Sequence, residues 1–335
     1  MLVHGAGGTI MVELIKKLII SNVKRRSALD GLGLDAMDDG ATIPLGDYEV
    51  VVTMDGHTVD PIFFPGGDIG RLAAAGTIND LAAMGARPLA IMDSIIVEEG
   101  FPLVALEKIV KSMNDVVEEV GAAIIHGDFK VMPKGRIDKI VISTAGVGLA
   151  ERGKVLKDSN LKPGDKIIVS GFIGDHGIAL ASVREGIEFD SALVSDVAPV
   201  WDVVEAAIKI GGVHAAKDPT RGGLSMALNE MASKSSLSIW IKEKDIPIRE
   251  EVKAASEMLG LNPLEVTCEG VIVLSVDGTV AEEVLEAIKS TKHGVHASII
   301  GEVREEPKGK VVLETIVGGK KLLEPPLGEP TPRVC

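Results

Sequence analysis

The chain has 335 residues, of which 46% are hydrophobic and 25% charged, and it carries a formal net charge of −14 at pH 7. These proportions are typical of a globular protein, and the length favours two domains over a single core. The acidic balance argues against general nucleic-acid binding, because such a surface repels phosphodiester backbones. It does not exclude a small phosphorylated ligand, since divalent cations bridge carboxylates to phosphates.

Membrane and secretion signals are not evident in the sequence. No apolar run reaches the roughly 18–20 residues of a membrane span. The N-terminus lacks the basic stretch and apolar run of a signal peptide. Cys268 and Cys335 are the only cysteines, too few for a secreted disulfide framework. We therefore expect a cytoplasmic protein with free thiols and no membrane contact.

The first half of the chain alternates β-type runs with Ala-rich helical segments, which is typical of an α/β fold. The predicted strands cover residues 48–54, 89–97, 122–127 and 139–149, and the predicted helices cover 69–84 and 103–120. The first of these strands is expected to end at Asp55-Gly56, and the third at Gly127.

The second half begins after a polar, Gly/Pro-containing stretch at 151–164. A strand is predicted from Lys166, and helices at 199–210, 223–233 and 280–290. The last residues contain four prolines and no periodicity, which favours an extended, mobile tail. We therefore predict an N-terminal domain at 1–155, a C-terminal α/β domain at 156–322 and a flexible tail at 323–335.

Acidic residues recur at predicted strand ends and turns, where α/β proteins place ligands. They are Asp39, Asp55, Asp80, Asp128 and Asp218. If several converged, they would offer Mg²⁺ the hard oxygen ligands that it takes beside a nucleotide triphosphate. Each aspartate alone is equally typical of an ordinary turn or helix N-cap, so the prediction depends on the set.

Three glycine-rich segments could bring backbone N–H groups close to phosphate. They are His4-Gly-Ala-Gly-Gly, residues 65–70, and Arg221-Gly-Gly. None matches a Walker A sequence or a dinucleotide-binding fingerprint. His4 is therefore either part of a binding segment or a terminal residue without a role.

Four further residues have both a structural and a chemical interpretation. Lys130 and Lys134, near Asp128, are either solvated charges or groups that neutralise transferred phosphate. Glu269 is either a turn residue or a general base. Cys335 is either an ordinary terminal residue or a tethered reactive thiol, and eleven extended residues from Pro325 would span up to about 36 Å.

The ordered set of these segments resembles the HypE family of hydrogenase maturation proteins, in the superfamily of aminoimidazole ribonucleotide synthetase and selenophosphate synthetase. The matching stretches are His4-Gly-Ala-Gly-Gly, Asp39-Gly-Ala, Asp60 to Gly70, Gly76 to Ala82, Gly127-Asp-Phe-Lys, Ser170 to Gly177, Asp218-Pro-Thr-Arg-Gly-Gly, Glu269-Gly and Pro332-Arg-Val-Cys. Phe129 departs from the family pattern, in which a threonine commonly stands there.

The resemblance implies an α/β (α+β) fold with two aminoimidazole ribonucleotide synthetase-like domains and a dimer built on the N-terminal sheet. It implies ATP and Mg²⁺ as cofactors. The metal ligands would be Asp39, Asp80, Asp128 and Asp218, and the nucleotide contacts His4, Gly7, Gly8, Asp55, Lys130 and Arg221. Cys335 would carry the reacting group, with Glu269 or the nearby Lys134 as proton acceptor.

The same resemblance implies an activity and partners. The carbamoyltransferase HypF would load Cys335 with a carbamoyl group, which this protein would dehydrate to a thiocyanate with ATP. Cyanide would then pass to iron on the HypC–HypD scaffold. The alternatives are another synthetase or kinase of the superfamily, such as a selenophosphate synthetase or a thiamine-monophosphate kinase, and a non-catalytic maturation scaffold. None of these requires a reactive terminal cysteine.

Overall fold

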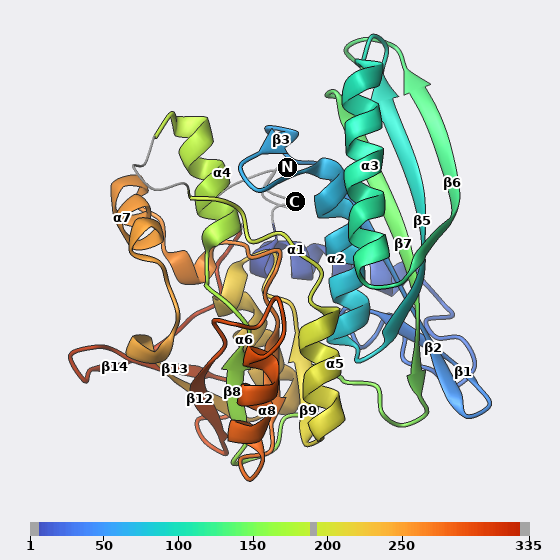
Figure 1. Ribbon diagram of the computed structural model, residues 1–335. Coiled ribbons are helices and arrows are strands. Elements are labelled where there is room, and N and C mark those ends of the chain that lie inside the picture. The colour runs from blue at the N-terminus through green and yellow to red at the C-terminus, as the bar shows by residue number, and fades with distance from the viewer. Residues whose placement is uncertain (1–6, 188–192, 329–335) are drawn as a thin grey trace.

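The computed structural model describes residues 7–187 and 193–328, which form two main β-sheets, one from each half of the chain (Figure 1). The first sheet has the strand order β1-β2-β7-β5-β6, in which only β5 and β6 run parallel. The elements of this half are α1 (Gly8–Leu14), the π-helical η2 (Ile15–Ile19), the 3-10 turn η3 (Ile20–Asn22), β1 (Ala41–Leu45), β2 (Tyr48–His57), β3 (Phe63–Phe64), β4 (Gly67–Asp68), α2 (Ile69–Ala83), β5 (Arg87–Glu98), α3 (Leu103–Glu119), β6 (Ala123–Met132) and β7 (Ile140–Glu151).

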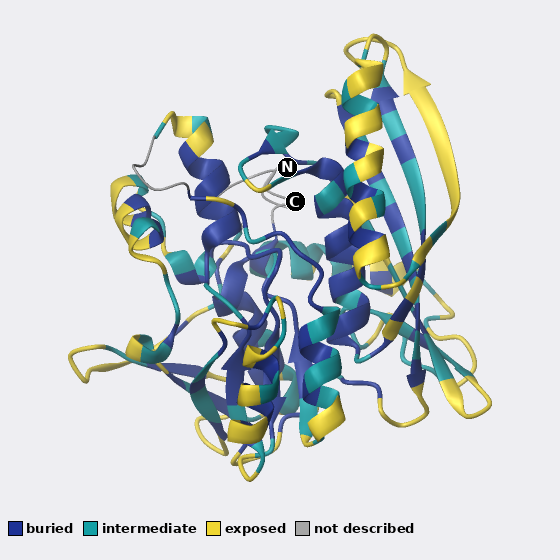
Figure 2. Ribbon diagram, in the orientation of Figure 1, coloured by how far each residue is buried: buried dark blue, intermediate teal, exposed yellow. Residues whose placement is uncertain are grey.

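Helix α2 is buried along almost its whole length (Figure 2). Asp68 caps its N-terminus by accepting hydrogen bonds from the backbone of Gly70 and Arg71. The helix packs against β2, β7 and α3, and its small residues Ala82 and Ala83 enter the core of the second half. The Ala-rich sequence therefore serves a central helix that both halves of the protein enclose.

Among the described residues, helices α2 and α3 cover one face of the first sheet. Residues of β7 alternate strictly between buried and half-buried, which is the pattern of a strand with one covered face. The edge strand β6 is exposed along nearly its whole length and is yellow at the right-hand side of Figure 2. This leaves an open sheet face and an open sheet edge in the single chain.

The second sheet has the order β14-β13-β10-β12-β8-β11-β9 and is covered on both faces. Strands β8 and β11 accordingly read as continuous apolar runs. The elements of this half are β8 (Lys166–Val169), α4 (Asp175–Glu185), α5 (Trp201–Ile210), β9 (Val213–Lys217), α6 (Gly223–Ser235), β10 (Ser238–Lys242), η4 (Glu243–Asp245), α7 (Glu250–Leu259), η5 (Pro263–Glu265), β11 (Val273–Val276), α8 (Ala281–Lys289), β12 (Ser298–Arg304), β13 (Val311–Glu314) and β14 (Lys320–Leu322).

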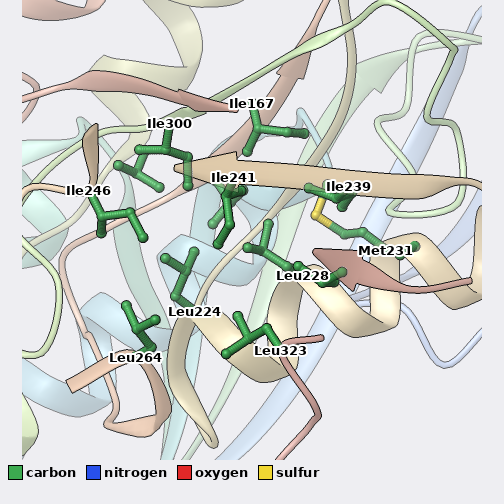
Figure 3. Close-up of a cluster of buried hydrophobic side chains, with 14 of the residues drawn as sticks. Ile167, Leu224, Leu228, Met231, Ile239, Ile241, Ile246, Leu264, Ile300 and Leu323 are labelled. Atoms are coloured by element: carbon green, nitrogen blue, oxygen red, sulfur yellow. The ribbon is translucent and has the colours of Figure 1, made fainter. Parts of the chain in front are cut away.

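One core of this half lies between α6 and the sheet, and it includes Leu323, which follows the last strand (Figure 3). Leu323 is 5% exposed and belongs to the same buried cluster as Leu228 of α6. The start of the expected tail therefore contributes to a hydrophobic core, where burial removes its leucine side chain from water.

Most predicted elements are confirmed, with two informative differences. The strand expected to end at Gly127 continues to Met132, and the strand expected to end at Asp55 includes it. A Cβ on Gly127 would lie 2.8 Å from Oδ1 of Asp93 on the neighbouring strand, so this glycine permits close strand packing rather than a turn. The domain boundaries stay a prediction. Within the described ranges, no helix is long and apolar enough to cross a membrane.

Candidate active site

A cavity of about 540 Å³ opens between the two halves of the protein. Its wall combines α1, the segment before β1, one end of β2, α2, the loop after β9 and the start of α6. The predicted site residues that line it are Gly7, Gly8, Asp39, Asp55, Asp80, Asp218, Arg221 and Glu269. Segments that are far apart in the sequence thus contribute to one site.

Three of the predicted metal ligands converge in this cavity. Asp39 precedes β1, Asp80 lies on α2 and Asp218 directly follows β9. One carboxylate oxygen from each lies within 4.8 Å of the others. Thr53 on β2 donates a hydrogen bond to Oδ2 of Asp80 over 2.5 Å, which holds this carboxylate in position.

The electrostatics of this cluster favour a bound cation. Burial, and then repulsion by Asp55, Asp218 and Asp39, raises the pKa of Asp80 well above its ordinary value. Burial and the charge of Asp39 raise the pKa of Asp218 to about 7. Oδ2 of Asp39 is buried without a hydrogen-bond partner. A divalent cation would relieve this repulsion and satisfy that oxygen, so the donor set fits Mg²⁺.

The rest of the cavity wall offers an apolar surface and a guanidinium group. The apolar side chains include Met11, Val12, Ile15, Ile19, Leu34, Met37 and Met226. Arg221 lies against Gly7, where a Cβ would approach Cβ of Arg221 to 2.8 Å, and Gly7 has φ +74°. Only glycine combines this backbone angle with that close approach. The wall of the cavity therefore combines apolar surface with charged and polar groups.

Glu269 is almost completely buried in the wall of the cavity. Its Oε1 accepts a hydrogen bond from Oγ1 of Thr267 over 3.2 Å. Burial, followed by the charges of Asp196 and Asp218, raises its pKa well above the ordinary value, although Arg221 opposes the shift. A carboxyl group in such surroundings accepts a proton readily when ionised, as a general base requires.

The segment 323–328, here called the anchored segment, runs from the second core to α1, which forms part of the cavity wall. Asn229 donates to the carbonyl oxygen of Leu323 over 2.8 Å, and Ser225 donates to that of Glu324 over 2.9 Å. At the other end, the backbone N–H of Thr9 donates to the carbonyl oxygen of Pro326 over 3.2 Å.

Gly8, at the start of α1, lets this end of the anchored segment approach closely. A Cβ on Gly8 would lie 2.7 Å from the backbone of Leu327 and Gly328. Gly8 also lines the cavity. The anchored segment therefore ends next to the cavity and crosses helices that form part of its wall.

Three further predicted site residues, all within the described part of the chain, lie outside this cavity. Asp128 and Lys130 lie mid-strand on exposed β6, where their side chains pair with each other at 3.4 Å. Lys134 lies in the exposed turn that follows β6. The expected loop around Asp128 is wrong, because Gly127 was interpreted as a strand end. His4 and Cys335 lie outside the described residues.

Some residues of the site were not anticipated from the sequence. Thr53 supports Asp80, and buried His57 lines the cavity and hydrogen-bonds Thr144. Burial is the main reason that the pKa of His57 is lowered, so the ring is neutral near pH 7. Lys217 contacts Asp39, although 178 positions separate them. The sequence feature that could have identified Lys217 as a site residue is its position directly before Asp218.

Comparisons with known proteins place the chain in a family. The models of the AIR synthase related protein N-terminal and C-terminal domains match residues 37–150 and 162–314. A carbamoyl dehydratase HypE of Rhizobium leguminosarum bv. viciae is 44% identical over 334 residues, covering 99% of this chain and 94% of that protein.

Solved structures agree with this result. A crystal structure of a HypE–HypF complex contains a chain 40% identical to this one, with a TM-score of 0.87 and coverages of 93% and 99%. A crystal structure of HypE in complex with ATP is 37% identical, with a TM-score of 0.83 and coverages of 100% and 99%. The chain therefore belongs to the HypE carbamoyl dehydratase family of AIR synthase related proteins.

Proposed function

We propose that this protein uses ATP to dehydrate a carbamoyl group on the thiol of its own Cys335. The product is a thiocyanate, which supplies the cyanide ligand of the iron in NiFe-hydrogenases. The names of the relatives and the solved HypE in complex with ATP support the reaction and its nucleotide. The observation that carries the proposal is the position of the anchored segment, which ends beside a cavity built from aspartates.

The distance to the cavity is compatible with this role of Cys335. Seven residues, 329–335, follow Gly328. Fully extended, they would span up to about 25 Å. Because Gly328 lies next to Gly8 in the cavity wall, the thiol of the same chain has the reach to enter. A short tether of this kind keeps the effective concentration of the reacting group high.

The proposed chemistry divides into two bond exchanges. The carboxamide oxygen attacks the γ-phosphorus of ATP, ADP leaves and the nitrogen loses one proton. The C–O bond then breaks, phosphate departs with the oxygen, the nitrogen loses its second proton and the C≡N bond forms. Glu269 is the proposed proton acceptor, and Arg221 faces the phosphate charge. Lys134 is less suited to accept a proton, because it lies in an exposed turn away from the cavity of its own chain.

Asp39, Asp80 and Asp218 are the proposed ligands of Mg²⁺. Bound there, the ion would neutralise charge on the transferred phosphate. The neighbouring Asp55 and the glycines Gly7 and Gly8 are proposed to line the triphosphate, and the apolar side chains the nucleotide base. This assignment follows the chemistry of the side chains that line the cavity.

We further propose a homodimer formed by the open face and edge of the first sheet. Ile125, Phe129 and Val131 on β6 are 63%, 52% and 57% exposed. Exposed apolar side chains on an unpaired edge strand favour association with another copy. In this dimer, Asp128 and Lys130 would serve the site across the interface. HypF is proposed to load the thiol and HypC–HypD to receive the cyanide, in the cytoplasm; a solved HypE–HypF complex supports the first of these partners.

Mass spectrometry of the C-terminal peptide tests the proposal. Protein carbamoylated on Cys335 should lose the mass of one water from this peptide after incubation with ATP and Mg²⁺. Asp80→Asn should retain the carbamoyl mass under the same conditions. If the wild type hydrolyses ATP while the carbamoyl mass persists, the protein acts as another kind of ATP-dependent enzyme and the proposal is wrong.

A further inference from the structure

Lys217, the last residue of β9, is a buried cation that the proposed reaction does not use directly. Its Nζ lies 2.5 Å from Oδ1 of Asp39, 3.2 Å from Oε2 of Glu230 and 3.9 Å from Oδ2 of Asp158. Its side chain is only 9% exposed. A buried lysine with three carboxylates around it keeps a defined position, because moving it away would leave several buried charges unpaired.

Lys217 is the main group that orients Asp39, whereas Asp80 and Asp218 are also positioned by the elements that carry them. Asp80 is held by helix α2 and by Thr53, and Asp218 directly follows β9, which is paired with β11. Asp39 lies in an irregular segment. Lys217 binds its Oδ1, while its Oδ2 is buried without a hydrogen-bond partner.

We propose that Lys217 is a positioning residue that holds one oxygen of Asp39 and thereby turns the other toward the cation shared with Asp80 and Asp218. This inference depends on the cation site proposed above. Groups that orient a metal ligand typically contribute 10–100-fold to metal affinity. Lys217 also supplies a fixed positive charge among the carboxylates, which lets them gather in one place before any cation binds.

A competing role for Lys217 predicts the opposite result. If the Lys217 ammonium group only paired with the carboxylates in place of a cation, its removal would leave a more negative site. Cation binding would then become tighter. Lys234 provides a matched control. It lies 2.5 Å from Oδ2 of Asp158 in the same group of charges but contacts none of the three proposed ligands.

The test is a titration of the full-length protein with Mn²⁺ alone, followed by electron paramagnetic resonance of the free ion. We expect Lys217→Met to weaken Mn²⁺ binding about 10–100-fold. Lys217→Arg and Lys234→Met should stay within about threefold of the wild type. Lys217→Gln replaces the methionine variant if that one does not fold. In an Asp39→Asn background, loss of Lys217 should cost no further affinity.

Unchanged or tighter binding by Lys217→Met would overturn the inference, and so would equal losses in Lys217→Met and Lys234→Met. The proposed cation site is tested separately by Asp80→Asn. If that variant binds Mn²⁺ as well as the wild type does, the site itself is wrong. If Asp80→Asn loses binding while Lys217→Met retains it, only the role of Lys217 fails.

Discussion

Thr53 on β2 donates a hydrogen bond of 2.5 Å to the carboxylate of Asp80 on α2. Asp80 is one of the three aspartates that converge in the cavity. This bond lowers the pKa of Asp80, but burial and the neighbouring aspartates outweigh it and raise the pKa. The fold therefore holds Asp80 firmly in a place where its charge is unfavourable without a cation. Such an arrangement favours ligand binding over the stability of the empty protein.

Asp80→Asn removes the charge while keeping the shape of the side chain. Mg²⁺-dependent ATP binding should weaken by about 100-fold or more, since this residue is a proposed ligand rather than a supporting group. The protein without cation should be at least as stable as the wild type, because repulsion among the aspartates falls. Calorimetric titration and thermal melting measure these effects, with exposed Asp47→Asn as the control. Full ATP affinity in Asp80→Asn would contradict the assigned role.

Asp196 gives a pH prediction outside the proposed metal ligands. Burial and then Asp175 raise its pKa to about 7, whereas an unfolded aspartate titrates near about 3.9. The folded state therefore binds a proton at Asp196 more tightly than the unfolded state does. The protonated carboxyl group contributes its full stabilisation of the folded state below about pH 4, and this contribution is lost as the pH rises through about 7.

Asp196→Asn is neutral at every pH and can still accept the hydrogen bond from the Glu269 backbone. It should flatten the decline in melting temperature between about pH 5 and about pH 8, and raise the melting temperature at the upper end. Circular dichroism melts across this range measure the slope. A slope equal to that of the wild type would mean that Asp196 is ionised in the folded protein throughout.

The contact between α1 and the anchored segment is tested by two glycines with the same backbone angle. Gly8 and Gly121 both have φ +70°, but a Cβ meets Leu327 at Gly8 and open space at Gly121. Both alanine variants bear similar backbone strain, about 1–2 kcal/mol. Only Gly8→Ala should slow dehydration, by about tenfold or more, since small displacements of reacting groups are costly.

A second variant distinguishes an effect of the anchored segment on dehydration from an effect of a changed cavity shape. Asn229→Ala removes the bond to Leu323 at the other end of the anchored segment. It should reduce dehydration while leaving ATP affinity unchanged, as measured by peptide mass and calorimetry. If both Gly8→Ala and Asn229→Ala dehydrate at the wild-type rate, anchoring does not matter for the reaction.

Mixed dimers test whether Asp128 acts across the interface. Asp80→Asn and Asp128→Asn homodimers should each be inactive. Random mixing of the two would give half heterodimers with one intact site each, and so about a quarter of wild-type activity. If the mixture stays inactive although heterodimers form, Asp128 and Asp80 belong to the same chain's site or Asp128 has another role.

Elements with a strong period or a clear break were predictable from sequence. The helix at 69–84 and the strand at 89–97 are confirmed by α2 and β5. Helix α4 was missed because it is buried on most sides and shows no apolar stripe. Strand β6 was cut short because a glycine within a strand and a glycine at a turn look the same without knowledge of the neighbouring strand.

The site was predictable to the extent that its residues lie at strand ends and turns. Asp39, just before β1, and Asp218, directly after β9, were anticipated on that ground and lie together. The partnership of Lys217 with Asp39 was not, because it connects positions 178 residues apart, and no local pattern encodes such a distance. Exposed Lys134 was selected because two lysines near an aspartate suggest phosphate binding, although strand β6 carries the segment away from its own cavity.

The burial of Leu323 couples the stability of the second half to the position of the anchored segment. Its side chain belongs to the core between α6 and the sheet, and its carbonyl oxygen accepts the hydrogen bond from Asn229. A polar side chain at this position would lower the free energy of unfolding, because it would be buried without a partner. It would also loosen the segment whose other end contacts Gly8, so one leucine contributes both to the core and to the placement of chain beside the cavity.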